Sequence, residues 1–216
     1  MIDNKDKNYI INSSNNNSTI TGANNKHQKQ IDRKDKNVSR IIEDIRRSDF
    51  QEHNMLIYPD LSTFRQIYLE CTRQALDNNE IVFLATTYDS FDRIADVLGT
   101  KGISMDSEMK DGNLIIVDAV RAYQVDTYGA MKLGKSLVMR AAREGKAGVF
   151  NLSDLGSFFL AEGINTLIEY ERSLPKKIDL QLKAICCYHK GNYDTLTGER
   201  QKEILSSHNT VLQVKN

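Results

Sequence analysis

The sequence predicts an α/β domain in which a mostly parallel sheet is covered by helices on both faces. Short apolar runs, typical of buried strands, alternate with stretches in which apolar residues recur at helical spacing. Gly, Asn and Pro residues separate these segments. Hydrophobic residues make up 40% and charged residues 27% of the 216-residue chain, which is ordinary for a soluble globular protein.

The first half of this domain is expected to hold three strands and two helices. The strands are the apolar runs 55–58, 81–85 and 114–117, whose length and composition suit burial on both faces. The first helix has apolar residues at helical spacing from 61 to 75 and stops at Asn78 and Asn79. The second helix is predicted to be capped by Asp89, to include residues 91–98 and to end at Gly99 or Gly102.

The second half continues the alternation of helices and strands. Its predicted elements, in chain order, are a helix over 133–141, a strand from 148, helices over 155–160 and 164–174, a strand over 180–188, a helix over 199–206 and a strand over 210–214. Repeated strand–helix units form parallel sheets through right-handed crossovers. Ligands bind such sheets beyond the carboxyl ends of the strands, so we expect the site there.

The chain is expected to divide into a tail, a short helix or linker, and the domain. Residues 1–36 are rich in Asn, Ser and Lys and have little to bury, so this tail is predicted to be disordered. Residues 37–50 contain an amphipathic stripe, and the domain covers residues 51–216. Residues 1–50 hold 10 Lys and Arg against 7 Asp and Glu, a mildly basic balance that only weakly suggests DNA binding and favours a solvated tail.

A cytoplasmic location is expected. No run of about 18 apolar residues is present, so no transmembrane helix is predicted. Residues 1–30 lack the apolar segment of a secretory signal. The cysteines Cys71, Cys186 and Cys187 are odd in number, and two are adjacent, so we interpret them as buried thiols in a reducing compartment.

One segment matches a phosphate-binding motif. Residues 129–136 read GAMKLGKS, the P-loop pattern, in which Gly129, Gly134, Lys135 and Ser136 would bind ATP with magnesium. A P-loop follows a buried strand, whereas the preceding residues 123–128 are largely polar or aromatic. The context therefore favours a helix with glycine and lysine in its first turns, and nucleotide binding or ATPase activity remains the alternative.

The other reactive side chains indicate neither a metal site nor an enzyme. The four histidines are His27, His53, His189 and His208, and no two of them lie at the spacing of metal ligands. Neither cysteine cluster has an obvious histidine partner along the chain. The sequence therefore predicts no catalytic group and no resident metal.

Several short segments, taken in order, resemble a known family. They are HNMLIY at 53–58, ALDNNEIV at 75–82, DGNL at 111–114, ICCY at 185–188, and His208 before the last strand. Over roughly residues 53–214 they resemble the MEDS domain, a sensory domain of methanogens and methylotrophs related to the KaiC/RecA ATPases. The resemblance implies a RecA-like core whose usual P-loop position, here 58–63, has neither glycine nor lysine.

These observations predict a non-catalytic cytoplasmic sensory domain, which the resemblance links to transcriptional or two-component signalling. It is expected to bind a small molecule or a signalling partner at the carboxyl edge of the sheet, without a cofactor, as a monomer or homo-oligomer. The polar groups expected nearest to the ligand are His53, Tyr58, Asp60, Thr86, Thr87 and Asp118.

Overall fold

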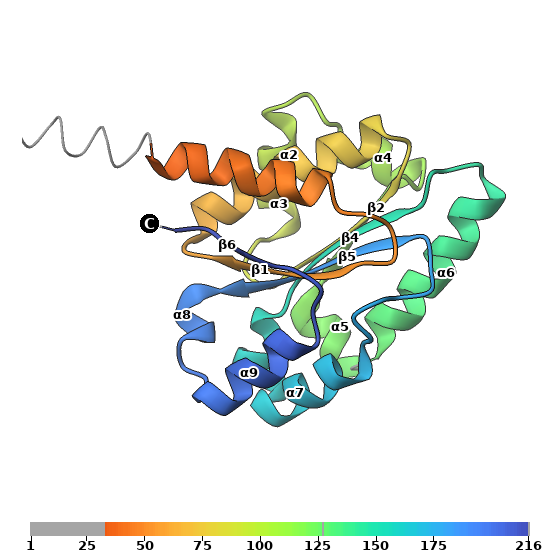
Figure 1. Ribbon diagram of the computed structural model, residues 1–216. Helices are drawn as coiled ribbons and strands as arrows, with labels where there is room; N and C mark the ends of the chain where they lie inside the picture. Colours follow the sequence, from red (N-terminus) through yellow and green to blue (C-terminus); the bar gives the residue numbers. More distant parts are fainter. Residues whose placement is uncertain (1–32, 127, 216) are drawn as a thin grey trace, which may run out of the picture.

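A six-stranded parallel sheet forms the centre of the protein in the computed structural model, which describes residues 33–126 and 128–215 (Figure 1). The strands lie in the order β3-β2-β4-β5-β1-β6, and every neighbouring pair is parallel. Their bounds are β1 His53–Tyr58, β2 Ile81–Thr86, β3 Leu114–Asp118, β4 Val149–Asp154, β5 Leu182–His189 and β6 Val211–Gln213. The predicted α/β class with a mostly parallel sheet is confirmed.

One face of the sheet is covered by α2 (Leu61–Asp77), α3 (Phe91–Gly99), α4 (Met105–Lys110) and a helix over residues 33–46 (Figure 1). Helix α2 begins where the Asp60 carboxylate accepts a hydrogen bond from the backbone N–H of Thr63, as an N-cap residue does. The buried side of these helices and one face of the strands form a continuous hydrophobic core.

The opposite face is covered by α5 (Ala119–Val125), α6 (Gly129–Arg143), α7 (Ile164–Ser173) and α9 (Gly198–Ser206) (Figure 1). A π-helical turn, η1 (Phe158–Glu162), precedes α7, and α8 (Lys190–Tyr193) follows β5. Gly163, with φ of 82°, separates η1 from α7, so the predicted division into two helices between residues 160 and 164 is observed. These elements enclose a second core against the sheet.

The helix over residues 33–46 packs on the same face as α2. Val38, Ile41 and Ile45 are at most 1% exposed and belong to the core of that face. Lys34 also forms a 2.7 Å ion pair with Asp60. The amphipathic stripe therefore has a packing role, and the helix includes residues 33–36, which the sequence placed in the tail. Residues 1–32, on which the tail prediction depends, lie outside the described residues.

Three short helices and one cap differ from expectation. Helices α4, α5 and α8 have at most seven residues each, too few for an apolar period to stand out in the sequence. Helix α3 is capped by Ser90 rather than Asp89. Asp89 instead accepts hydrogen bonds from the guanidinium of Arg65 and the hydroxyl of Tyr68.

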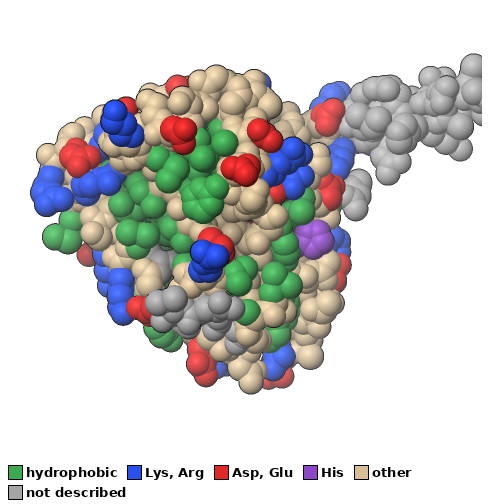
Figure 2. All heavy atoms as spheres, turned by 180° about the vertical axis from the view of Figure 1, so that it is seen from behind, with side chains coloured by type: hydrophobic (Ala, Val, Ile, Leu, Met, Phe, Trp, Pro, Cys, Tyr) green, Lys and Arg blue, Asp and Glu red, His purple; other side chains and the backbone are tan. Residues whose placement is uncertain are grey.

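The surface seen from behind combines apolar and charged groups. Hydrophobic side chains gather there in a patch, with Lys or Arg and Asp or Glu side chains around it (Figure 2). Because both signs of charge are interspersed, this face does not present the continuous basic surface that nucleic-acid binding uses. Within residues 33–126 and 128–215, no helix has the length and apolar character needed to cross a membrane.

Candidate functional site

The carboxyl edge of the sheet, where the sequence placed the site, contains a cavity of about 590 Å³ beside the ends of β2 and β3. Thr86, Thr87 and Asp118, three of the residues expected near a ligand, line it. Tyr58 lies at the same edge, at the end of β1, but is not among the lining residues.

Most polar side chains at this edge already form helix caps or hydrogen bonds within the protein. Asp60 caps α2, and Asp118 caps α5 by accepting a hydrogen bond from the backbone N–H of Arg121. The hydroxyl of Thr87 donates to the backbone carbonyl of Asp154 and accepts from the backbone N–H of Ser157. These contacts account for the polar side chains without a ligand.

Asp154, the last residue of β4, is fully buried behind this edge. Its Oδ2 accepts a hydrogen bond from the hydroxyl of Tyr58 at 3.1 Å, and its Oδ1 accepts one from the backbone N–H of Gly156 at 2.9 Å. Burial raises the pKa of Asp154 to about 7, although both hydrogen bonds act in the opposite direction. Both carboxyl oxygens are thus occupied by protein donors.

His53 does not lie with the other predicted site residues, which corrects the sequence prediction. It is the first residue of β1, whereas Tyr58 is the last. Five residues of extended strand span about 16 Å, so His53 lies at the amino edge of the sheet. The predicted ligand-binding set is therefore divided between two opposite edges.

The amino-edge cavity, of about 510 Å³, lies on the face of the sheet covered by α6 and α7. Its floor includes His53, Ala184 and Asn151, which are aligned across the adjacent strands β1, β5 and β4. The middle residue of this row is alanine, whose small side chain leaves space above the sheet at this point. The remaining lining residues are Met131, Gly134, Lys135, Tyr170, Ser173, Leu174, Pro175, Ile178, Asp179, Leu180, Leu182 and Cys186.

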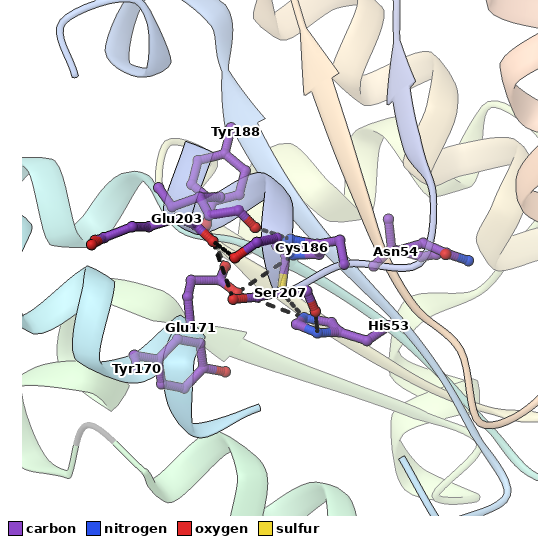
Figure 3. A network of polar contacts seen from close by, with 12 residues as sticks. His53, Asn54, Tyr170, Glu171, Cys186, Tyr188, Glu203 and Ser207 are labelled. Carbon is purple, nitrogen blue, oxygen red and sulfur yellow. Dashed lines mark hydrogen bonds and ion pairs between the residues drawn. The ribbon is translucent and has the colours of Figure 1, made fainter. Parts of the chain in front are cut away.

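Four side chains, each at most 3% exposed, meet beside this cavity: His53, Glu171, Cys186 and His208. They come from the start of β1, the last turn of α7, the middle of β5 and the segment after α9. Figure 3 shows His53, Glu171 and Cys186 directed toward one another. One potential ligand atom from each of the four lies within 4.8 Å of all the others, so these are the residues that could hold a metal ion.

The two histidine rings are held by backbone carbonyls. Nδ1 of His53 lies 3.0 Å from the carbonyl oxygen of Ser207, and Nδ1 of His208 lies 2.7 Å from that of Ile204. A carbonyl only accepts, so each Nδ1 carries the proton and each Nε2 presents a lone pair. The centroids of the two rings are 4.2 Å apart.

The carboxyl group of Glu171 is bonded on one side only. Its Oε1 accepts a hydrogen bond from the hydroxyl of Tyr188. Within the described part of the chain, neither Oε2 of Glu171 nor Nε2 of His208 has a hydrogen-bond partner, although both atoms are buried. These two atoms lie 3.4 Å from each other, so the proton of the neutral carboxyl group points to Nε2 of His208, and a ligand that displaces this proton can bind both atoms.

Burial keeps the cluster uncharged when it is empty. It lowers the pKa of His53 to about 3 and that of His208 to about 4. It raises the pKa of Glu171 to about 8 and that of Cys186 well above its usual value. Desolvation disfavours the charged form in all four cases.

The segment with the P-loop pattern forms the first half of α6. Gly129 is the first residue of this helix, and Gly134, Lys135 and Ser136 lie within it. Backbone N–H groups inside a helix bind carbonyls four residues earlier and cannot wrap phosphate oxygens. The segment thus adopts the helix favoured by its context, and Gly134 and Lys135 line the amino-edge cavity.

Sequence spacing missed the cluster because its members are far apart along the chain. The expectation that neither cysteine cluster has a histidine partner is wrong, since Nε2 of His53 lies 3.2 Å from Sγ of Cys186. Glu171 gave no signal in the sequence, because its partners in the cluster come from other elements. The segments that carried the family resemblance were the available signal, because His53, Cys186, Tyr188 and His208 all belong to them.

Comparison with known proteins identifies one family. The family model described as MEDS, the "MEthanogen/methylotroph, DcmR Sensory domain", matches residues 52–209. The match covers most of the chain and includes the whole buried cluster. No curated protein sequence matches the chain. The relation to KaiC and RecA ATPases stays a prediction.

Proposed function

The chain belongs to the MEDS family of sensory domains, and we propose that it senses a small, largely apolar organic molecule bound in the amino-edge cavity. The observation that carries this proposal is the cavity itself, whose volume of about 510 Å³ is in the range of small-molecule sites. Binding would shift the protein between states that a downstream partner distinguishes.

The lining of the cavity supports an apolar ligand with one polar end. Leu174, Ile178 and Leu180 contribute apolar walls, while His53 and Cys186 contribute polar groups at the floor. Ligand sites commonly combine mostly apolar walls with a few convergent polar groups and titratable residues of shifted pKa. This cavity has both features.

The carboxyl-edge cavity has less support as the ligand site. It is of similar size, about 590 Å³, but Thr87 and Asp118 among its polar residues are engaged in hydrogen bonds that hold loops and helix ends. A ligand there would have to compete with these bonds. His53 and Cys186 at the amino edge are hydrogen-bonded as well, but the apolar walls there let an apolar ligand bind without breaking those bonds.

The proposal is tested with the neutral fluorescent probe N-phenyl-1-naphthylamine and two variants of the full chain. Ala184→Met places a larger side chain on the floor of the amino-edge cavity. Val120→Phe enlarges a half-buried residue that lines the carboxyl-edge cavity and serves as the matched control. We expect Ala184→Met to weaken probe binding about tenfold, because roughly 1.4 kcal/mol of apolar contact is lost.

The control decides between the two cavities. Val120→Phe is expected to bind the probe as the unmodified protein does. Equal binding by Ala184→Met together with loss in Val120→Phe would move the site to the carboxyl edge. Absence of probe fluorescence with the folded, unmodified chain would contradict a ligand cavity at either edge.

Nucleotide binding is a second candidate function, which a single observation supports. Lys135 lines the amino-edge cavity and supplies a cation there, which is the observation in its favour. The helical backbone at Gly129–Ser136 argues against a phosphate-wrapping loop. Titration with a fluorescent ATP analogue and magnesium tests it: saturable binding that Lys135→Ala abolishes would support this candidate.

A further inference from the structure

The buried cluster has a composition that metal ions use. Its four potential ligands are two imidazole nitrogens, one thiol sulfur and one carboxyl oxygen, contributed by His53, His208, Cys186 and Glu171. Nitrogen, sulfur and oxygen ligands of this kind bind Zn²⁺ and related divalent ions. The four residues come from four separate elements, so the fold and not local sequence brings them together.

Three of the six distances between the ligand atoms are close to those around a tetrahedral ion, and all six are within 4.8 Å. Nε2 of His53 lies 3.2 Å from Sγ of Cys186 and 3.8 Å from Oε2 of Glu171. Nε2 of His208 lies 3.4 Å from the same carboxyl oxygen. Around a tetrahedral ion with ligand bonds of about 2.0–2.3 Å, neighbouring ligand atoms are about 3.3–3.8 Å apart.

Hydrogen bonds around the cluster orient its potential ligand atoms so that they can bind a cation. Both histidines have Nδ1 bound to a backbone carbonyl, the arrangement that directs Nε2 of a metal-ligating histidine toward the ion. The Tyr188 hydroxyl holds the other oxygen of Glu171. The unpartnered atoms, Oε2 of Glu171 and Nε2 of His208, are the ones that face the centre of the cluster.

A route to the cluster exists through the cavity. His53 and Cys186 line the amino-edge cavity, so one side of the cluster is reached from it. Glu171 and His208 close the other side and are at most 3% exposed.

We propose that His53, Glu171, Cys186 and His208 bind one divalent transition-metal ion of the zinc class. On binding, the Cys186 thiol and the Glu171 carboxyl release their protons to solvent, and each then shares an electron pair with the ion. The two imidazoles bind through Nε2 without a proton change. The site adjoins the cavity of the proposed function but does not depend on a small molecule entering it.

The test is a Co²⁺ titration of the full chain after reduction and removal of metal by a chelator. Tetrahedral Co²⁺ shows visible absorption bands, and a cysteine ligand adds thiolate-to-cobalt charge-transfer absorption in the near ultraviolet. We expect both signals to saturate at one ion per chain and to disappear when Zn²⁺ is added. A folded chain without the charge-transfer signal would overturn the proposal.

The adjacent cysteines provide a matched control. Cys186 faces the cluster, whereas Cys187 belongs to the core on the opposite face of the sheet. Cys186→Ser is expected to lose the charge-transfer signal and to weaken Co²⁺ binding at least about tenfold. Cys187→Ser is expected to keep both, and loss of the signal in Cys187→Ser with retention in Cys186→Ser would contradict the assignment.

A second variant tests the role of Cys186 even if Cys186→Ser fails to fold. The double variant Cys71→Ser with Cys187→Ser leaves Cys186 as the one thiol of the chain. It is expected to retain the charge-transfer signal, and its failure to do so while folded would also overturn the proposal. Probe binding to the chelator-treated chain is measured separately, so failure of the metal site and failure of the ligand cavity are distinguishable.

Discussion

A tyrosine and a buried carboxyl group are paired at two places in the protein, but the hydrogen bonds of the two carboxyl groups differ. In both places a tyrosine hydroxyl donates to a buried carboxyl group: Tyr58 to Asp154 at the carboxyl edge, and Tyr188, from near the carboxyl end of β5, to Glu171 in the cluster beside the amino-edge cavity. Asp154 accepts a second bond from the backbone N–H of Gly156, so both of its oxygens are occupied. The second oxygen of Glu171 is unpartnered among the described residues.

This difference separates a structural group from a binding group. A buried carboxyl with both oxygens bonded holds β1, β4 and the following turn together and offers nothing to a ligand. A buried carboxyl with one free oxygen facing two histidines, beside a cavity, retains capacity for a ligand. The location of the unpartnered atoms, more than the size of either cavity, therefore favours the amino edge.

The largest expected effect concerns the pH dependence of stability at the carboxyl edge. The pKa of Asp154 is about 7 in the folded protein and about 3.8 in the unfolded chain. Between these values the folded state holds a proton that the unfolded state has lost, so the free energy of unfolding falls as pH rises. Asp154→Asn should remove up to about 4 kcal/mol of this dependence between about pH 4 and 7.

Urea unfolding of the unmodified chain and of Asp154→Asn across this pH range measures the effect. Glu171, whose pKa is also raised, contributes with the same sign in both proteins, so it cancels in the difference. If the difference in unfolding free energy between the unmodified chain and Asp154→Asn does not change with pH, Asp154 is ionised in the folded protein. That result would weaken the contrast between Asp154 and Glu171.

Two matched substitutions with smaller expected effects compare the two carboxyl groups directly. Tyr58→Phe and Tyr188→Phe each remove one hydroxyl from a buried carboxyl group, and each should lower the free energy of unfolding by about 1–3 kcal/mol. Only Tyr188→Phe should also weaken Co²⁺ binding, by about 10–100-fold, because Tyr188 holds a proposed ligand. Equal Co²⁺ affinities in the two variants would remove the distinction between structural and binding carboxyl groups.

The sequence predicted the elements better than the site. Strands such as Ile81–Thr86 were recognisable because they are short apolar runs between turn residues. The GAMKLGKS segment has strong helix formers at most positions, which agrees with its place in α6. These features depend on neighbours along the chain, so local pattern is sufficient to find them.

The cluster depends on long-range contacts and was not predictable from spacing. His53 and His208 are 155 residues apart in the chain, and their rings meet because β1 lies between β5 and β6. The assignment of His53 to the carboxyl edge was wrong because His53 precedes the apolar run 55–58 and begins β1, whereas a residue at the carboxyl edge follows its strand. The side-chain partners of Glu171 are likewise visible only in the folded chain.

The central claim is that ligands bind at the amino edge of the sheet. Amide chemical shifts of the isotopically labelled full chain, recorded with and without N-phenyl-1-naphthylamine, test it most directly. The account predicts the largest shifts at His53, at Ala184 and along residues 173–182, which border the amino-edge cavity. Largest shifts at residues 86–94 and 116–121, around the carboxyl-edge cavity, would contradict it.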